Sequence, residues 1–424
     1  MKKYSKSIGI IIFGFVFITT NFWFGNYVME KKFKEYKIYS DAVGYYIYLP
    51  SFFINKDVDS QYGYSLPNGK FINKYNYGVA FFEMPVFLIQ YKLAGLFKTQ
   101  PDTYGIYYGR GILLSASIYL FFGLLMLYSY LKQLFGSFTS IVTILLVYLA
   151  TNLLYYATVE PGMSHVYTFF CVCGVLYFTE KSIRTNYLKY HIANAFLIAL
   201  IILIRPINLP VVFFFLFYDL YNFKDIKNRM YFYLRNIRLP LIYIGALLIV
   251  FIPQIAYWKI VTGHYLVYSY GYNNESFIYW KCPKFSDVYF GSQCGWLSYT
   301  PVMGFALVGL VILVIKKKYN GLAIVLTMLF ISYLCASWWC NFSCAFGYRS
   351  FVEYYPLLSI PLAWFMKKYI IDKSVILTGM FIVTMIYINI SITYYFSYTG
   401  WSWCEQNWTW PVYWTALKYI FFGL

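Results

Sequence analysis

Acidic side chains are scarce in this chain, which has only sixteen Asp and Glu residues. One of them, Asp41, stands alone in an otherwise uncharged, aromatic-rich run from Ile38 to Asn55. We expect this setting to desolvate the carboxylate and raise its basicity, so that it could take a proton from an attacking hydroxyl. Ser40 and Asp41 also fit the N-cap of a surface helix that begins at Ala42. Both roles stay open, and one residue can fill both.

A second group of reactive residues lies in the segment from Thr158 to His165. Pro161 and Gly162 predict a turn that places Glu160 and His165 within reach of each other. Because ionisable groups near apolar depth are costly, the pair could contact a substrate or form a polar relay. The alternative is a hydrogen-bonded turn between two helices.

Two arginines have the chemistry to bind an anion. Arg205 follows an apolar run, and Arg349 ends an outer turn that contains Trp338 and Trp339. The guanidinium fork suits phosphate, although an arginine can also extend to the headgroup level from a buried stem. Indoles stack on sugar faces, and they also anchor helices at membrane interfaces.

The overall composition indicates a membrane protein. Of its 424 residues, 61% are hydrophobic and 12% are charged, and the mean hydropathy is +0.56. The apolar runs are long and continuous, which predicts an all-α polytopic bundle and not a transmembrane barrel. The net charge of +18 comes from basic residues beside apolar runs, so it indicates topology and no nucleic-acid partner.

A ruler of about 20 residues per span predicts about 11 transmembrane helices. They lie near residues 8–26, 106–131, 138–157, 165–179, 190–204, 208–221, 239–258, 298–315, 321–337, 351–366 and 374–396. The first is interpreted as a retained helix and not as a cleaved signal peptide. The run 77–97 is interrupted by polar residues and is predicted to be an amphipathic helix on the outer surface.

The distribution of Lys and Arg predicts a cytoplasmic N-terminus. The chain is then a single membrane domain, 1–424, with a long first outer loop with juxtamembrane helices (27–105), a second large outer loop (259–297) and an outer interfacial tail (397–424). All the candidate reactive residues fall on the outer side.

Other chemical templates are weak. The three histidines do not form a metal-binding pair on one helix, and no nucleophile elbow or phosphate loop is present. A divalent metal stays possible, but no ligand set is identified. Five cysteines are predicted on the outer side, among them Cys344 and Cys404, and a disulfide between Cys282 and Cys294 is possible if that compartment is oxidising.

Taken in order, these residues resemble the GT-C superfamily of polytopic glycosyltransferases, closest to the aminoarabinose transferase and protein O-mannosyltransferase branch. The likeness runs from the first helix to about Pro356. It rests on Asp41, on Phe82-Glu83-Met84-Pro85, on the Glu160 to His165 turn, on Arg205-Pro206, and on the Trp339 to Arg349 turn with the following SFVEYYP.

This chain departs from the pattern at two places. Met84 stands where that branch has a lysine, so Lys74, Arg205 or Arg349 would have to hold the donor phosphate. Ala42 follows Asp41, so the paired acidic residues of the catalytic position are absent.

The resemblance implies transfer of a sugar from a polyprenyl-phosphate donor to an acceptor hydroxyl on a lipid, glycan or protein. Asp41 would be the base of a single inverting displacement at the outer face of a bacterial inner membrane. The residues expected to bind substrate are Tyr45, Lys74, Glu83, Glu160, His165, Arg205, Trp339 and Arg349. An O-antigen polymerase or ligase, or a transporter or flippase of lipid-linked glycans, is the alternative.

Overall fold

The computed structural model describes residues 2–33, 38–340, 345–399 and 409–422. Over these residues the chain is almost entirely helical, which confirms the predicted all-α class. The one sheet in this described part is a small antiparallel pair in the first outer loop, in which β1 (Tyr64–Ser65) faces β2 (Phe71–Ile72).

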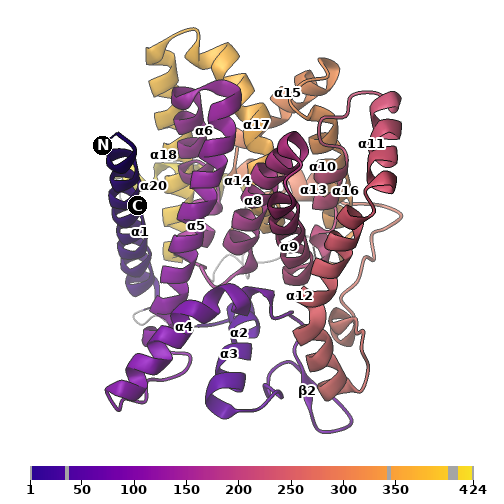
Figure 1. Ribbon diagram of the computed structural model, residues 1–424. Helices are drawn as coiled ribbons and strands as arrows, with labels where there is room; N and C mark the ends of the chain where they lie inside the picture. Colours follow the sequence, from indigo (N-terminus) through magenta and orange to yellow (C-terminus); the bar gives the residue numbers. More distant parts are fainter. Residues whose placement is uncertain (1, 34–37, 341–344, 400–408, 423–424) are drawn as a thin grey trace.

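The helices form a bundle with a separate group of short elements at its lower end (Figure 1). The elements up to the middle of the chain are α1 (Lys2–Phe33), α2 (Asp41–Tyr46), α3 (Tyr48–Pro50), the π-helix η1 (Ser51–Asn55), α4 (Gly78–Leu96), α5 (Ile106–Phe135), α6 (Ser137–Leu149), α7 (Leu153–Thr158), α8 (Ser164–Thr185), α9 (Leu188–Ile204), the 3₁₀ helix η2 (Pro206–Asn208) and α10 (Val211–Leu216). They are followed by α11 (Phe223–Arg235), α12 (Arg238–Thr262), the 3₁₀ helix η3 (Ser269–Asn273), α13 (Phe285–Phe290), α14 (Trp296–Tyr299), α15 (Val302–Ile315), α16 (Gly321–Ser337), the 3₁₀ helix η4 (Arg349–Tyr354), α17 (Tyr355–Met366), the π-helix η5 (Lys367–Ile371), α18 (Val375–Thr399) and α20 (Trp410–Phe422).

Six helices in the described part of the chain are long and apolar enough to cross a membrane. They are residues 10–28 of α1 together with α4, α5, α8, α12 and residues 375–397 of α18. Shorter apolar helices occupy most of the other predicted spans. Two predictions were wrong in detail: the segment 138–157 is broken at 150–152 into α6 and α7, and 208–221 contains only the six-residue α10 as α-helix.

The helix α4 covers the segment 77–97, which was predicted to be an amphipathic surface helix. Two of the polar residues that interrupt the segment turn toward the protein, because Glu83 is buried beside Tyr167 and Gln90 donates to the Tyr107 carbonyl at 2.5 Å, whereas Lys92 is exposed. Its exposed face carries apolar side chains together with Lys92, and the helix is long and apolar enough to cross a membrane. Figure 1 shows it running obliquely across the lower end of the bundle.

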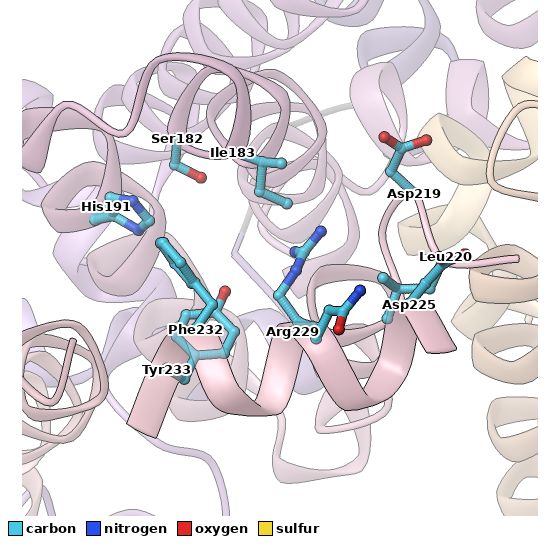
Figure 2. Close-up of a pocket in the computed structure, with 10 residues that line it drawn as sticks. Ser182, Ile183, His191, Asp219, Leu220, Asp225, Arg229, Phe232 and Tyr233 are labelled. Atoms are coloured by element: carbon cyan, nitrogen blue, oxygen red, sulfur yellow. The ribbon is translucent and has the colours of Figure 1, made fainter. Parts of the chain in front are cut away.

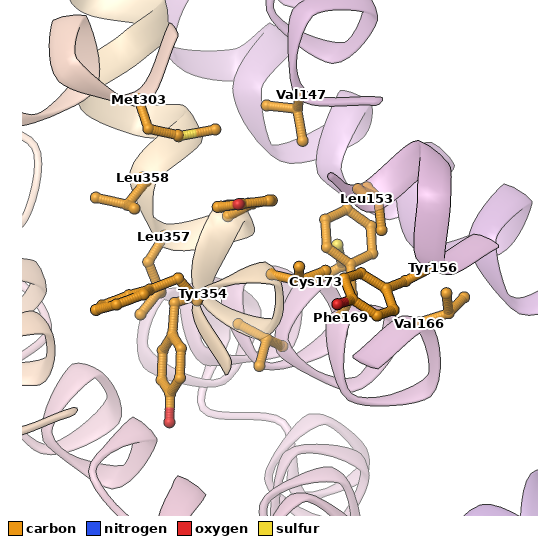
Figure 3. Packing of buried hydrophobic residues seen from close by; sticks show 14 of the residues in the cluster. Val147, Leu153, Tyr156, Val166, Phe169, Cys173, Met303, Tyr354, Leu357 and Leu358 are labelled. Atoms are coloured by element: carbon orange, nitrogen blue, oxygen red, sulfur yellow. The ribbon is translucent and has the colours of Figure 1, made fainter. Parts of the chain in front are cut away.

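The centre of the bundle is α8, which packs against α5, α9, α17 and η4. Its side chains are buried along most of its length. Figure 3 shows part of this core, which includes Val166 and Phe169 of α8, Tyr156 of α7, and Tyr354 and Leu357. Such close packing fixes the ends of the helices relative to one another.

The helix ends that carry the candidate residues meet the first outer loop. Asn76 donates to the Leu203 carbonyl near the end of α9, and Asn68 donates to the Val261 carbonyl near the end of α12, both at 2.8 Å. The Ile38 amide bonds to the Tyr104 carbonyl, just before α5. These contacts hold α2 under the bundle.

The C-terminal helix α20 packs along α18. Tyr387, near the middle of α18, donates to the Leu417 carbonyl, and Tyr413 donates to the Ser298 carbonyl at 2.8 Å. The predicted tail 397–424 is thus helical over 410–422 and is held against a long apolar helix; its residues 400–408, 423 and 424 lie outside the described part of the chain.

Candidate active site

Asp41 is the first residue of α2, and not the residue before it. Ser40 has a positive φ of 54°, and its side chain makes no capping hydrogen bond. The prediction that Ser40 and Asp41 cap this helix through a side-chain hydrogen bond is therefore wrong. Asp41 instead lies in the first turn, where a carboxylate is favoured by the exposed N–H groups of a helix.

The carboxylate of Asp41 pairs with Arg349, from the other end of the sequence. Arg349 Nη2 donates to Asp41 Oδ2 at 2.8 Å, and the Arg349 and Asp41 side chains are 29% and 25% exposed respectively. Burial acts to raise the pKa of Asp41, but Arg349, a Tyr75 hydrogen bond and Lys74 together bring that pKa below its ordinary value. The expected increase in basicity is thus reversed by a cation that lies 308 positions away in the sequence.

Tight aromatic packing supports Asp41 from below. The rings of Tyr45 and Tyr75 lie 4.4 Å apart, centroid to centroid. A Cβ placed on Gly44 would stand 2.2 Å from the Tyr75 ring, so glycine is required at this close approach. Asn73 locks the same turn by donating to the Gly44 carbonyl at 2.6 Å. Tyr75 is therefore held where its hydroxyl reaches Asp41.

Lys74 brings the second outer loop to this site. Its ammonium lies 3.0 Å from Glu275 Oε1 and 5.1 Å from the centroid of the Tyr75 ring. Ser269 donates to the Lys74 carbonyl at 2.7 Å. The two predicted outer loops, 27–105 and 259–297, are therefore joined beside Asp41.

A second charged centre is buried behind the first. Glu353, which is fully buried, accepts from Arg205 Nη1 at 2.9 Å and lies 2.9 Å from His165 Nδ1. Its other oxygen accepts from Asn208. Burial acts to raise the pKa of Glu353, but the Arg205 charge and the His165 contact lower it overall.

The sequence predicted that His165 and Glu160 lie within reach of each other. In the structure His165 pairs with Glu353 instead. Glu160 accepts instead from the Tyr155 hydroxyl at 3.0 Å. The turn between α7 and α8 is present, but Glu160 and His165 form hydrogen bonds with different partners.

The two charged centres share one short element. The 3₁₀ helix η4 carries Arg349 at its start and Glu353 one turn later. Arg205 also reaches η4 by donating to Ser350 Oγ at 3.3 Å. Tyr45 lies between the centres: burial raises its pKa, Arg205 and Arg349 act to lower it, and Asp41 adds to the increase. Asp41, Tyr45, Lys74, His165, Arg205 and Arg349 thus gather at one end of the bundle.

Two of the predicted substrate contacts lie in other settings. Glu83 lies within α4, fully buried, and accepts from Tyr167 at 3.2 Å. Trp339 is 40% exposed, and its backbone amide bonds to the Ser276 carbonyl. Residues 341–344 of the predicted outer turn lie outside the described part of the chain.

Several partners in the site were not predicted from the sequence. Glu353, Asn208, Tyr75 and Glu275 had not been singled out. Glu353 had a signal, because it stands in the aromatic stretch SFVEYYP without another acid, which is the pattern that pointed to Asp41. The other three have no comparable signal in the sequence.

The described residues do not fit a metal site. Among them, no three His, Cys, Asp or Glu side chains are grouped closely enough to hold a metal ion. The carboxylates of Asp41, Glu275 and Glu353 each lie against a cationic side chain. Cys282 carries a free, exposed thiol, so the Cys282–Cys294 disulfide is not formed; Cys344 and Cys404 lie outside the described part.

Comparison with known proteins supports the fold. The chain is similar to the crystal structure of ArnT from Cupriavidus metallidurans in the apo state, with a TM-score of 0.50 and 13% identity over 91% of this chain. It spans 65% of the length of that ArnT chain. This likeness confirms the predicted GT-C-like fold of an integral membrane protein.

Two solved structures of an archaeal oligosaccharyltransferase from Archaeoglobus fulgidus match less well. AglB in complex with an inhibitory peptide and a dolichol-phosphate has a TM-score of 0.48 and 12% identity, over 91% of this chain and 55% of its own. The apo form has the same TM-score and identity, over 93% and 56%. No model of a protein family matches the chain, and no curated protein is similar to it in sequence.

Proposed function

We propose that this protein transfers a sugar from a polyprenyl-phosphate-linked donor to an acceptor hydroxyl at the outer face of a membrane. The observation that carries the proposal is the Asp41–Arg349 pair, a partly exposed carboxylate and a partly exposed guanidinium in direct contact at one end of a GT-C-like bundle. A base for the acceptor and a cation for the leaving phosphate are the two groups that such a displacement needs.

The pair supplies these two groups in a definite order. In the resting site Arg349 holds Asp41 ionised and weakly basic, because the guanidinium lowers the pKa of the carboxyl. A bound donor phosphate competes for the guanidinium fork, which suits phosphate as well as carboxylate. Asp41 then loses its cation and becomes a stronger base beside the acceptor.

The chemical step is a single displacement. The acceptor oxygen attacks the anomeric carbon and passes its proton to Asp41 while the bond from that carbon to the phosphate oxygen breaks. The leaving phosphate keeps the electron pair, and Arg349 stabilises its charge. Attack from the face opposite the phosphate inverts the configuration of the anomeric carbon.

The neighbouring cations have graded roles. Lys74 lies against Glu275, and Arg205 lies against the buried Glu353. Arg205 fixes η4 and adds positive charge behind the phosphate, while Lys74 ties the second outer loop to the site. Trp339, which is exposed, offers a ring face for the sugar. Tyr45 and His165 are buried and hold the site in shape, and Glu160 lies at the turn before His165.

The test is transfer by purified full-length protein in proteoliposomes that contain a polyprenyl-phosphate-linked sugar. The proposal expects an acceptor that gains one sugar by mass, with an anomeric configuration opposite to that of the donor. Transfer of a whole glycan would favour a polymerase or ligase. Movement of the donor between leaflets without any transfer would favour a flippase, and either result would overturn the proposal.

A further inference from the structure

A cavity lies at the opposite end of the bundle from Asp41. It has a volume of about 360 Å³, and its lining includes Ser182, His191, Asp219, Arg229 and Phe232 (Figure 2). Ser182 is in the last turns of α8 and His191 in the first turn of α9. Since His165 begins α8 at the other centre, 17 residues of helix, about 25 Å, separate the two sites.

Arg229 gives this cavity an unused hydrogen-bond donor. Its Nη2 donates to the Tyr218 carbonyl at 3.2 Å, but its Nη1 is buried and has no hydrogen-bond partner among the described residues. In Figure 2 the guanidinium points from α11 into the space below Ile183. A buried charged donor without an acceptor is costly, so the arrangement calls for an anion.

The two carboxylates that line the cavity have different partners, and the Asp219 side chain is hydrogen-bonded to Tyr221. Asp225 is engaged in the capping box of α11, where it accepts from the Asn222 amide at 3.2 Å. Asp219 is exposed at the rim, with its backbone held by Asn320 at 2.6 Å. The cavity therefore presents a positive group inside and a negative group at its mouth.

The outward face of α11 indicates that lipid lies beside the cavity. Met230, Tyr231 and Leu234 are 62%, 52% and 68% exposed. Exposed basic residues flank them, including Lys227, whose ammonium lies 5.8 Å from the centroid of the Tyr231 ring. Apolar side chains bordered by lysines are typical of a helix at a membrane surface.

We propose that the cavity binds the headgroup of an aminophospholipid. The phosphate bonds to Arg229 Nη1, and the ammonium pairs with Asp219 at the rim. Leu220 and Phe232 meet the upper parts of the acyl chains. The site is distinct from the proposed transfer reaction and does not depend on it.

The test measures which lipid stays bound to the purified full-length protein. Protein depleted of lipid is incubated with vesicles of phosphatidylethanolamine or phosphatidylglycerol with the same acyl chains, and bound lipid is counted by native mass spectrometry. The wild type should retain phosphatidylethanolamine at least about tenfold more strongly, the ratio for one charged contact of about 1.4 kcal/mol. Arg229→Gln should lose retention of both lipids, and Asp219→Asn should erase the preference. Lys227→Gln, on the same helix but outside the cavity, should behave as wild type.

As a control for folding, the unfolding temperature of each variant is measured in the absence of lipid. Ile183→Trp fills the cavity without changing its charge and should also abolish retention. The proposal is overturned if folded Arg229→Gln and Ile183→Trp proteins both keep the lipid. It is equally overturned if inorganic phosphate displaces the lipid at concentrations equal to that of the lipid, which would identify a free phosphate site, or if both lipids bind alike to the wild type.

Discussion

The two charged centres that meet at η4 contain similar groups in different surroundings. Asp41 and Arg349 form a two-membered pair, each about a quarter exposed. Glu353 is fully buried and has Arg205, His165 and Asn208 around it. A partly exposed pair can exchange partners with a substrate at smaller cost than a fully buried carboxylate with several donors, which can lose none of them cheaply. The comparison assigns chemistry to the first centre and positioning to the second.

Removal of the buried carboxylate should have the largest effect on the protein. Glu353→Ala leaves the Arg205 charge buried without its partner, which typically costs about 3–5 kcal/mol. We expect a large drop in unfolding temperature and in folded yield, measured in detergent. Asp41→Asn is the matched change in the exposed pair and should cost no more than about 1 kcal/mol. Equal losses in the two variants would contradict the division of roles.

Arg349 should matter for donor binding more than for stability. Arg349→Gln removes a charged hydrogen bond to the phosphate and should weaken binding of a polyprenyl phosphate about 10- to 100-fold, the equivalent of about 1.5–3 kcal/mol. Arg349→Lys keeps the charge but not the guanidinium fork, so its affinity for polyprenyl phosphate should lie between that of the wild type and that of Arg349→Gln. Binding is measured by titration in nanodiscs. An unchanged affinity in Arg349→Gln would move the phosphate site elsewhere.

Acid should weaken both centres. The pKa values of Asp41 and Glu353 are lowered in the folded protein, so their stabilising contributions are complete above the ordinary values, near 4. These contributions are lost as the pH falls through the lowered folded values. We expect the unfolding temperature of the wild type to fall steeply below about pH 4. The Glu353→Gln variant should start lower and show a shallower fall; the same slope in both proteins would be inconsistent with a charged Glu353.

The smallest expected effect concerns how α2 begins. Because Ser40 makes no capping bond, Ser40→Ala should change the free energy of unfolding by less than about 0.5 kcal/mol. Asn222→Ala, which removes the capping box of α11, should cost about 1 kcal/mol. Chemical unfolding of the two variants side by side checks this. A larger loss of unfolding free energy in Ser40→Ala would show that the Ser40 side chain does cap α2.

Much of the fold could be predicted from hydropathy, because a membrane demands long apolar helices. The position of Asp41 on the same side as the two arginines could be predicted from loop charges. The arginine that pairs with Asp41 could not be predicted, because contacts between residues 308 positions apart depend on the packing of the whole bundle. The burial of Glu83 in α4 could not be predicted for a related reason: hydropathy does not show that this carboxylate has a partner, Tyr167, on α8.

In the proposed reaction Asp41 acts on the acceptor and Arg349 acts on the donor. The most direct test measures donor binding and sugar transfer with the same preparation of Asp41→Asn in proteoliposomes. The account predicts that the variant binds the polyprenyl-phosphate-linked sugar at least as tightly as the wild type, because Arg349 is released from its carboxylate, while transfer falls about 100- to 10,000-fold. Transfer at the wild-type rate by the folded variant would contradict the account.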